Sequence, residues 1–486
     1  MDGHTRVCSN SAALPAPPPA AFTDPGLWPF GVLVLSVAFL VVLIAVLRVH
    51  AFLALVLAAI AAGLLAPVGS LPGEPERSHY VQAVELTTSE FGTTAGKVAV
   101  VIALAAVIGM CLMESGAADK VVRRFLAVFG EKRSGLAILL SSYVLSIPIF
   151  FDTFFMLVLP LARALALRTG RNYVLYVMAI CSAGVITHGL VVPHPGPLTM
   201  AEVMNVDVGQ TIVAGLLVGT IPLAASWFLI RRLDRRLDLP APAHPGDAAA
   251  LDRPESELPS FTFSILPVLL PIVLISSAST AAAMRGFSAE HPGLFRAVEF
   301  IGNRNVALLA GAFLAIALLM RTKRLPLARV GELIGPPFET AGVIILITSA
   351  GGAFGLMLKN AGVGEAIRAA AEGREVNLVL LSWAVAAVIR IAQGSTTVAL
   401  LTTAAMMEPM LSGPDPLPFH RVYVFLAIGF GGTILSWMND SGFWVVGRLS
   451  GFTEKQTLQT WTVVLSFNSV VGLLATLLLS RVLPLV

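Results

Sequence analysis

The 486-residue sequence is poor in charged side chains and in the residues that build metal or nucleotide sites. Charged residues make up 13% of the chain, whereas 56% is hydrophobic and the mean hydropathy is strongly positive. The three cysteines (Cys8, Cys111 and Cys181) lie far apart, so packing roles are favoured over disulfide or metal roles. No Walker-type Gly-Lys-Ser/Thr loop, zinc signature or nucleotide fingerprint occurs, which leaves an ATP-driven pump without support. The composition instead indicates a membrane protein.

The N-terminal segment differs from the rest of the chain. Residues 1–27 are rich in Ala and Pro and end before the first apolar stretch at Trp28. The apolar run 29–47 is too long for a typical signal-peptide core, and no clear small-residue cleavage site follows it. We therefore expect a disordered tail followed by a retained first helix.

Several apolar stretches, such as 93–113 and 338–358, approach the roughly 20 residues that cross a bilayer as a helix. Two others, 134–167 and 376–411, are too long for one span and are interrupted near their middles. Their arms hold about 14–18 residues each, which is short for a crossing. Each of these two segments is therefore predicted to form either a re-entrant hairpin or a pair of short spans.

Positively charged residues near membrane ends mark the cytoplasmic side. The basic clusters are Lys120, Arg123, Arg124, Lys132 and Arg133; Arg168 and Arg171; Arg231, Arg232, Arg235 and Arg236; and Arg321, Lys323 and Arg324. If both interrupted segments are hairpins, the chain crosses about ten times and every basic cluster lies inside. Both termini and the acidic loop 67–92 are then predicted to be extracytoplasmic.

Two polar, helix-breaking runs interrupt other apolar stretches. Residues 186–200 contain two histidines and three prolines, and residues 436–444 contain Asn439-Asp-Ser-Gly442. Backbone that leaves the helix at membrane depth is tolerated only where protein or a water-filled cavity satisfies its polar groups. Two such breaks at corresponding positions of two halves indicate the binding site of a secondary transporter.

An offset of 245 residues relates three landmarks of the chain. It pairs residues 114–123 with 359–368, Asp152 with Thr397, and His194-Pro-Gly-Pro197 with Asn439-Asp-Ser-Gly442. An offset close to half the chain argues for a duplication, and an odd number of crossings in each half inverts the second copy. We therefore predict an all-α polytopic membrane protein of two inverted repeats, 28–230 and 261–486, joined by a Pro-rich cytoplasmic linker at 231–260.

Three motifs resemble the gluconate permease family, whose members are bacterial proton symporters for gluconate and related sugar acids. The motifs lie at Thr187–Pro197, Val388–Ala399 and Asn439–Trp444, and the similarity continues from about residue 29 to the C-terminus. The resemblance implies a fold of the ion-transporter superfamily with inverted repeats, hairpins and broken helices. It also implies a place in the bacterial inner membrane. Ser441 stands where many relatives have proline, and Gln393 where several have an aliphatic residue.

A sugar acid needs a cationic or amide-rich group for its carboxylate and hydrogen-bonding groups for its hydroxyls. The run Gly394-Ser-Thr-Thr397 would supply hydroxyls and backbone N–H groups at a helix start, unless the hydroxyls bond back within a helix. Arg390 would hold a carboxylate bidentately; its alternatives are snorkelling or pairing with Glu408 or Asp440.

His188 and His194 are expected to titrate or to bind sugar hydroxyls, because neighbouring prolines open the helix around them. Packing is the alternative for both histidines, and metal binding is disfavoured because no carboxylate or cysteine ligand set accompanies them. The expected substrate contacts are Thr187, His188, Gly189, His194, Pro195, Gly196, Arg390, Gly394, Ser395, Thr396, Thr397, Asn439, Asp440, Ser441 and Gly442.

Asp152 is the first candidate for a proton carrier, and Asp440 is the second. Asp152 lies among Phe150, Phe151, Phe154 and Phe155, and apolar crowding disfavours the charged form of a carboxylate. The alternative for Asp152 is a helix cap after Pro148.

The predicted function is uptake of gluconate or a related sugar acid by proton symport. The partners would be the sugar acid, a proton and membrane lipid, with no nucleic acid, cofactor or metal. A homo-oligomer is left open. The alternatives are a sodium-coupled carboxylate transporter, a passive channel and a membrane-embedded enzyme, but the enzyme lacks an activated serine, a cysteine or a metal set beside the histidines.

Overall fold

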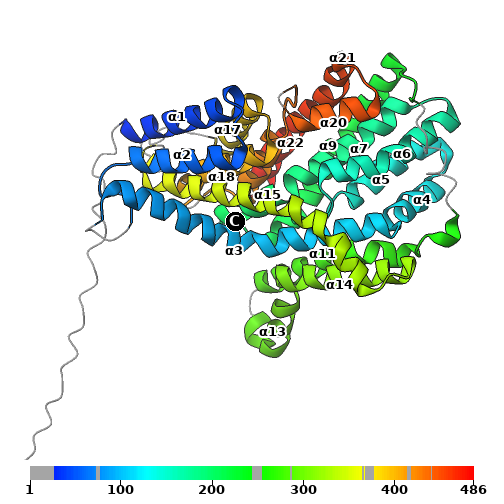
Figure 1. The fold of residues 1–486 in the computed structure, drawn as a ribbon, viewed down its shortest axis with the longest axis horizontal. Helices are drawn as coiled ribbons and strands as arrows, with labels where there is room; N and C mark the ends of the chain where they lie inside the picture. The colour runs from blue at the N-terminus through cyan, green and yellow to red at the C-terminus, as the bar shows by residue number, and fades with distance from the viewer. Residues whose placement is uncertain are drawn as a thin grey trace, which may run out of the picture.

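The computed structural model describes residues 27–72, 77–242, 254–284, 287–363, 366, 377–412, 417–438 and 440–485. Every regular element within these residues is a helix, as the sequence predicted (Figure 1). Seven helical stretches are long and apolar enough to cross a membrane: His79–Glu114, Tyr173–Val203, Val208–Leu237, Phe261–Ala282, Arg304–Lys323, Leu327–Asn360 and Glu454–Val482. The chain is therefore built as a multi-pass membrane protein. Cys8 and Asn439 lie outside the described residues.

The first half of the chain contains two interruptions in its helices. Its elements are α1 (Trp28–Val41), η1 (Val42–Val46), α2 (Ala51–Leu65), α3 (His79–Glu114), α4 (Ala117–Phe129), η2 (Glu131–Arg133), α5 (Ser134–Leu145), α6 (Phe151–Thr169), α7 (Tyr173–Leu190), α8 (Pro195–Val203) and α9 (Val208–Leu237). The long apolar segment 134–167 forms α5 and α6 with a break at 146–150. The histidine-containing run forms the break between α7 and α8.

The second half contains the same kinds of interruption. After η3 (Glu255–Glu257), its elements are α11 (Phe261–Ala283), α12 (Phe287–Glu290), α13 (Pro292–Ile301), α14 (Arg304–Lys323), α15 (Leu327–Asn360), α17 (Leu378–Gln393), α18 (Thr396–Leu411), α19 (Val422–Gly431), α20 (Ser441–Ser450), α21 (Glu454–Thr457), η4 (Leu458–Thr462) and α22 (Val463–Val482). The segment 376–411 breaks between α17 and α18, and a second break separates α19 from α20.

The helix bounds recur along the chain at the offset that relates the sequence motifs. Shifted by 245 residues, α3 (79–114) becomes 324–359, and α15 spans 327–360. The same shift turns α8 (195–203) into 440–448, beside α20 at 441–450. Both long helices are followed by a glycine in the left-handed conformation, Gly116 at φ 75° and Gly362 at φ 76°, which a side chain would strain. The two halves therefore share an order of helices and breaks.

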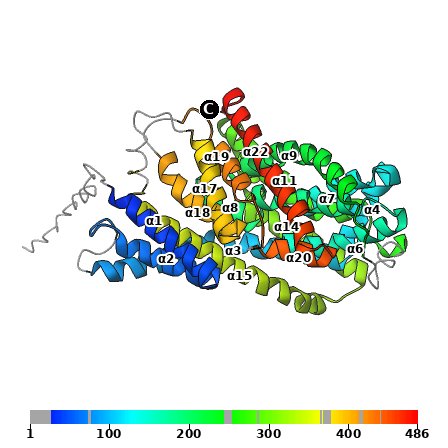
Figure 2. The same cartoon turned by 90° about the horizontal axis from the view of Figure 1, so that it is seen from above.

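Helices α3 and α15 are longer than the apolar stretches 93–113 and 338–358 on which they were expected. They contain 36 and 34 residues and run side by side through the molecule (Figures 1 and 2). The extra turns lie at their N-terminal ends. On α3 these turns bury Ala83 and Thr87, so packing extends the helix beyond the apolar run.

The α7–α8 stretch occupies the interior of the molecule. In its most apolar window, 94% is buried, against 28% for Phe261–Ala282 in α11. The helices α1 and α2 lie at one end of the molecule and α4 to α6 at the other (Figure 1). The break between α7 and α8 therefore lies deep inside the protein, where the binding site of a transporter is expected.

Candidate functional site

In the first half, the break after α5 meets the break after α7. The Ser146 and Thr187 hydroxyl oxygens lie 2.7 Å apart, and Nε2 of His194 lies 2.9 Å from the Ser146 carbonyl oxygen. The rings of His188 and His194 have their centroids 4.9 Å apart. Ser146, Thr187 and His194 are buried. The two breaks thus form one polar cluster inside apolar helices.

In the second half, an ion pair joins the α17–α18 break to the α19–α20 break. Arg390 is only 2% exposed, and Nη2 of its guanidinium lies 2.5 Å from Oδ2 of Asp440. The guanidinium also donates to the carbonyl oxygen of Gly394. Of the two structural partners expected for Arg390, the structure shows Asp440; Glu408 instead pairs with Lys359.

Asp440 is held by more than its ion pair. It accepts hydrogen bonds from the Ser436 hydroxyl and, at 3.0 Å, from the backbone N–H of Gly442 at the start of α20. The Trp461 indole N–H donates to the same Ser436 hydroxyl at 2.6 Å. Trp461 was not predicted as part of the site, and no local sequence pattern marks it. Ser436, by contrast, is the first residue of the polar run 436–444, so the sequence did point to its position.

The two clusters adjoin through glycines. A Cβ at Gly189 would lie 2.8 Å from Cγ2 of Thr433, and a Cβ at Gly196 would lie 2.7 Å from Cδ1 of Leu400. The first break therefore packs directly against α18 and the end of α19 because its glycines have no side chains. The predicted motif positions of both halves come together in one region.

Ionisable groups from both halves act on one another in this region. The charges of Arg390 and Asp440 both act on the imidazole of His188, and the charge of Asp440 acts on Asp152. These four side chains come from α6, α7, α17 and the start of α20. Charged and titratable groups at the four breaks are therefore close enough to interact.

Two polar atoms of these groups are buried without a hydrogen-bond partner among the described residues. They are Nε of Arg390 and Nδ1 of His188. A buried polar group without a partner costs about 1–3 kcal/mol, and more when it is charged. Both atoms therefore remain available for a polar ligand.

The hydroxyl-rich run after Gly394 starts α18 as expected. Gly394 is in the left-handed conformation at φ 83°, and the Ser395 hydroxyl caps α18 by accepting from the Val398 N–H at 3.4 Å. Thr396 and Thr397 are half-buried in the first turn. Thr187 bonds back to the Ala183 carbonyl oxygen of its own helix at 3.2 Å. Pro195 and Gly196 are buried in the first turn of α8, and Ser441 is exposed.

The surroundings of Asp152 bear on its predicted role as a proton carrier. Asp152 lies in the first turn of α6 on the exposed side, whereas Phe151, Phe154 and Phe155 are buried. At 100° per residue, Asp152 points about 100° away from Phe151 and about 60° away from Phe155 around the axis of α6. The role of Asp152 as a proton carrier stays a prediction.

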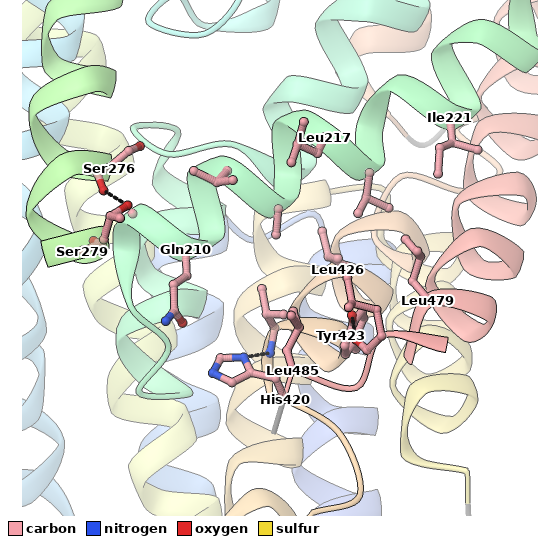
Figure 3. Close-up of a pocket in the computed structure, with 17 residues that line it drawn as sticks. Gln210, Leu217, Ile221, Ser276, Ser279, His420, Tyr423, Leu426, Leu479 and Leu485 are labelled. Carbon is pink, nitrogen blue, oxygen red and sulfur yellow. Dashed lines mark hydrogen bonds between the residues drawn. The ribbon is translucent and has the colours of Figure 1, made fainter. Parts of the chain in front are cut away.

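A cavity of about 680 Å³ lies elsewhere, between α9, α11, α19 and α22. Figure 3 shows Leu217, Ile221, Leu426 and Leu479 gathered on one side of it, with Gln210 and His420 on the other. None of the predicted site residues lines this cavity. Most of the side chains that line this cavity are apolar, so its volume alone does not make it the candidate site.

Comparison with known proteins places most of the chain in one family. The family described as "GntP family permease" matches residues 28–482. The low-affinity gluconate transporter of Escherichia coli K12 is 32% identical over 456 residues, covering 92% of this chain and 97% of that protein. The gluconate permease of Pseudomonas aeruginosa is 35% identical over 447 residues, covering 91% and 96%. The Gnt-II system L-idonate transporter of Escherichia coli K12 is 30% identical over 457 residues, covering 94% and 100%.

Two solved structures share the fold. The YdaH transporter of Alcanivorax borkumensis superposes with a TM-score of 0.61 at 15% identity, covering 92% of this chain and 99% of that one. Neisseria gonorrhoeae MtrF superposes with a TM-score of 0.60 at 15% identity, covering 90% and 94%. At this identity the likeness concerns the fold alone. The family match and the named relatives show that the chain belongs to the GntP permease family and is a membrane transporter, not an enzyme.

Proposed function

We propose that this protein takes up gluconate or a related sugar acid together with a proton. One observation carries the proposal: within the described residues, a buried arginine at the helix breaks has an unpartnered Nε, and a half-buried histidine within range of its charge has a buried, unpartnered Nδ1. The substrates named for the relatives, gluconate and L-idonate, are both hydroxylated carboxylates. Such a molecule offers an anion to the arginine and hydroxyls to its polar neighbours.

In this proposal the substrate carboxylate binds the free edge of the Arg390 guanidinium. The hydroxyls are bound by His188 and by Ser395, Thr396 and Asn439, the groups that the sequence places at the breaks. The remaining predicted contacts at the breaks line the pocket. Their glycines and prolines interrupt the helices and leave backbone polar groups exposed to the substrate.

Asp440 supplies a route for proton coupling. Its carboxylate already occupies one edge of the Arg390 guanidinium, so it competes with the substrate for the same positive charge. Protonation of Asp440 removes that competition, so proton and substrate binding favour each other. Asp152 is the other candidate for the proton carrier, because it lies close enough to Asp440 for the two charges to interact.

We also propose that the two halves are inverted repeats in the bacterial inner membrane with both termini outside. The recurrence of helix bounds at an offset of 245 residues supports a duplication. The one-sided basic clusters support the orientation. Transport would then move one set of helices past the other around the breaks.

The test is equilibrium binding of gluconate to the purified protein, combined with uptake into liposomes under an imposed pH gradient. Arg390→Gln should abolish both binding and uptake. Because removing one partner of a buried ion pair destabilises a protein by about 3–5 kcal/mol, the double variant Arg390→Gln, Asp440→Asn is the matched control for folding. If the folded double variant still binds gluconate as the wild type does, the site lies elsewhere. Uptake that requires sodium at fixed pH and ignores the pH gradient would favour the sodium-coupled alternative.

A further inference from the structure

A second polar region lies between α3, α8, α15 and α18. It is a pocket of about 160 Å³ whose charged lining residues are Glu90, Lys97, Glu202, Lys359 and Glu408. Helices α8 and α18 also connect this pocket to the proposed substrate site, because both begin at its breaks. At a rise of 1.5 Å per residue, Glu202 lies about 12 Å along α8 from its cap His194, and Glu408 about 20 Å along α18 from its cap Ser395.

Buried hydroxyls line these same two helices. Thr199 on α8 and Thr402 and Thr403 on α18 have hydroxyl oxygens that are buried and have no hydrogen-bond partner within the described residues. In a purely structural helix, a threonine hydroxyl bonds back to its own helix, as Thr187 does. Thr199 also lines the pocket. The unpartnered hydroxyls indicate a polar route between the pocket and the site.

Ion pairs of the pocket residues Glu202 and Glu408 tie these helices to their neighbours. Nζ of Lys359 on α15 lies 3.1 Å from Oε2 of Glu408 on α18, and Arg304 on α14 pairs with Glu202 on α8. Glu408 is nearly buried, with 9% of its side chain exposed. Each pair therefore joins a helix that starts at the proposed site to a helix that does not.

Lys97 is the remaining cation of the pocket. Its side chain is exposed and has no hydrogen-bond or ion-pair partner among the described residues. An unpaired ammonium at the rim of a polar pocket attracts a carboxylate from solution.

We propose that this pocket is the mouth of the substrate path, that the Lys359–Glu408 ion pair closes it, and that Lys97 attracts the incoming carboxylate. The proposal rests on the function proposed above, because the route leads to that site. Opening requires α18 to separate from α15, and the break at Gly394 and Ser395 provides a hinge. A partly exposed ion pair is weak enough to break in each cycle and strong enough to bias the closed form.

The experiment measures how fast a membrane-impermeant thiol reagent modifies Thr199→Cys in the full-length protein in liposomes. Cys8→Ser removes the thiol of the tail, and Cys111 and Cys181 are buried. Glu408→Gln or Lys359→Gln should raise the rate about fivefold, which corresponds to the roughly 1 kcal/mol of a partly exposed ion pair at 1.4 kcal/mol per tenfold. Exchanging the two residues, Lys359→Glu with Glu408→Lys, should return the rate to that of the starting protein.

The matched control is another ion pair on α15, Arg329–Glu332, which is exposed and does not line the pocket. Arg329→Gln should leave the modification rate unchanged. An unchanged rate in folded Glu408→Gln would overturn the gate, and an equal rise in Arg329→Gln would show a general loosening instead. The labelling assay needs no substrate, so it tests the gate independently of the proposed function. A failure of gluconate to bind would overturn the proposed function and would leave the labelling result unaffected.

Lys97→Gln tests the attraction of the carboxylate. It should raise the KM of gluconate uptake severalfold and leave equilibrium binding at the central site unchanged. A KM equal to that of wild type would remove Lys97 from the path.

Discussion

The ion pair between Arg390 and Asp440 yields the sharpest prediction. Asp440→Asn keeps the shape of the side chain and removes its charge, so the guanidinium of a 2% exposed arginine loses its counter-ion. Leaving a buried charge unpaired costs about 3–5 kcal/mol, so the unliganded variant should unfold at a lower temperature than wild type. A bound carboxylate replaces the lost charge.

The same substitution should therefore tighten substrate binding. A hydrogen bond to a charged group contributes about 1.5–3 kcal/mol, so removing the competing carboxylate should raise gluconate affinity roughly 10- to 100-fold. Gluconate should also raise the melting temperature of the variant more than that of wild type. Uphill accumulation under a pH gradient should be lost, because asparagine cannot exchange a proton.

Calorimetric titration of gluconate over a range of pH separates the two roles of Asp440. If Asp440 links the proton to the substrate, a pH dependence of gluconate affinity in wild type disappears in the variant, since linkage needs a group that exchanges a proton. The reasoning is refuted if folded Asp440→Asn binds gluconate with wild-type affinity and wild-type pH dependence.

Three further predictions concern the other site residues and the orientation. Asp152→Asn should keep gluconate binding and exchange but lose accumulation in liposomes if Asp152 carries the proton; wild-type accumulation would leave that role to Asp440 or a histidine. Alanine at Ser395, Thr396 or Asn439 should weaken gluconate binding by about 1–3 kcal/mol in calorimetry, and unchanged affinity in all three with intact transport would move the hydroxyl contacts elsewhere. For the inverted arrangement, Thr169→Cys should react with impermeant reagents only from the cytoplasm and Ser412→Cys only from outside, so labelling of both from one side contradicts it.

The positions of the helix breaks could be predicted from sequence because they depend on local chemistry. Glycine, proline and polar residues in the runs 186–200 and 436–444 break helices wherever they occur, and the structure breaks its helices there. The choice between Glu408 and Asp440 as the partner of Arg390 could not be predicted in this way. It depends on how α17, α18 and α20 pack against one another, and no local sequence pattern predicts that packing.

The lengths of α3 and α15 could not be predicted from the sequence, because packing stabilises the turns that precede their apolar stretches. Trp461 was also missed, since its bond to Ser436 joins residues 25 positions apart without a pattern.

The length of α3 affects the conditions at the proposed mouth. Its apolar residues 93–113 span about 32 Å, which matches the hydrocarbon thickness of a bilayer, so residues 79–92 extend roughly 21 Å further, into the headgroups and water. Glu90 and Lys97 flank that boundary, which places the mouth at the level of the lipid phosphates rather than in the acyl region. Anionic lipids lower the potential at this level and repel carboxylates. The lipid composition of the membrane would therefore set the local concentration of substrate that reaches Lys97.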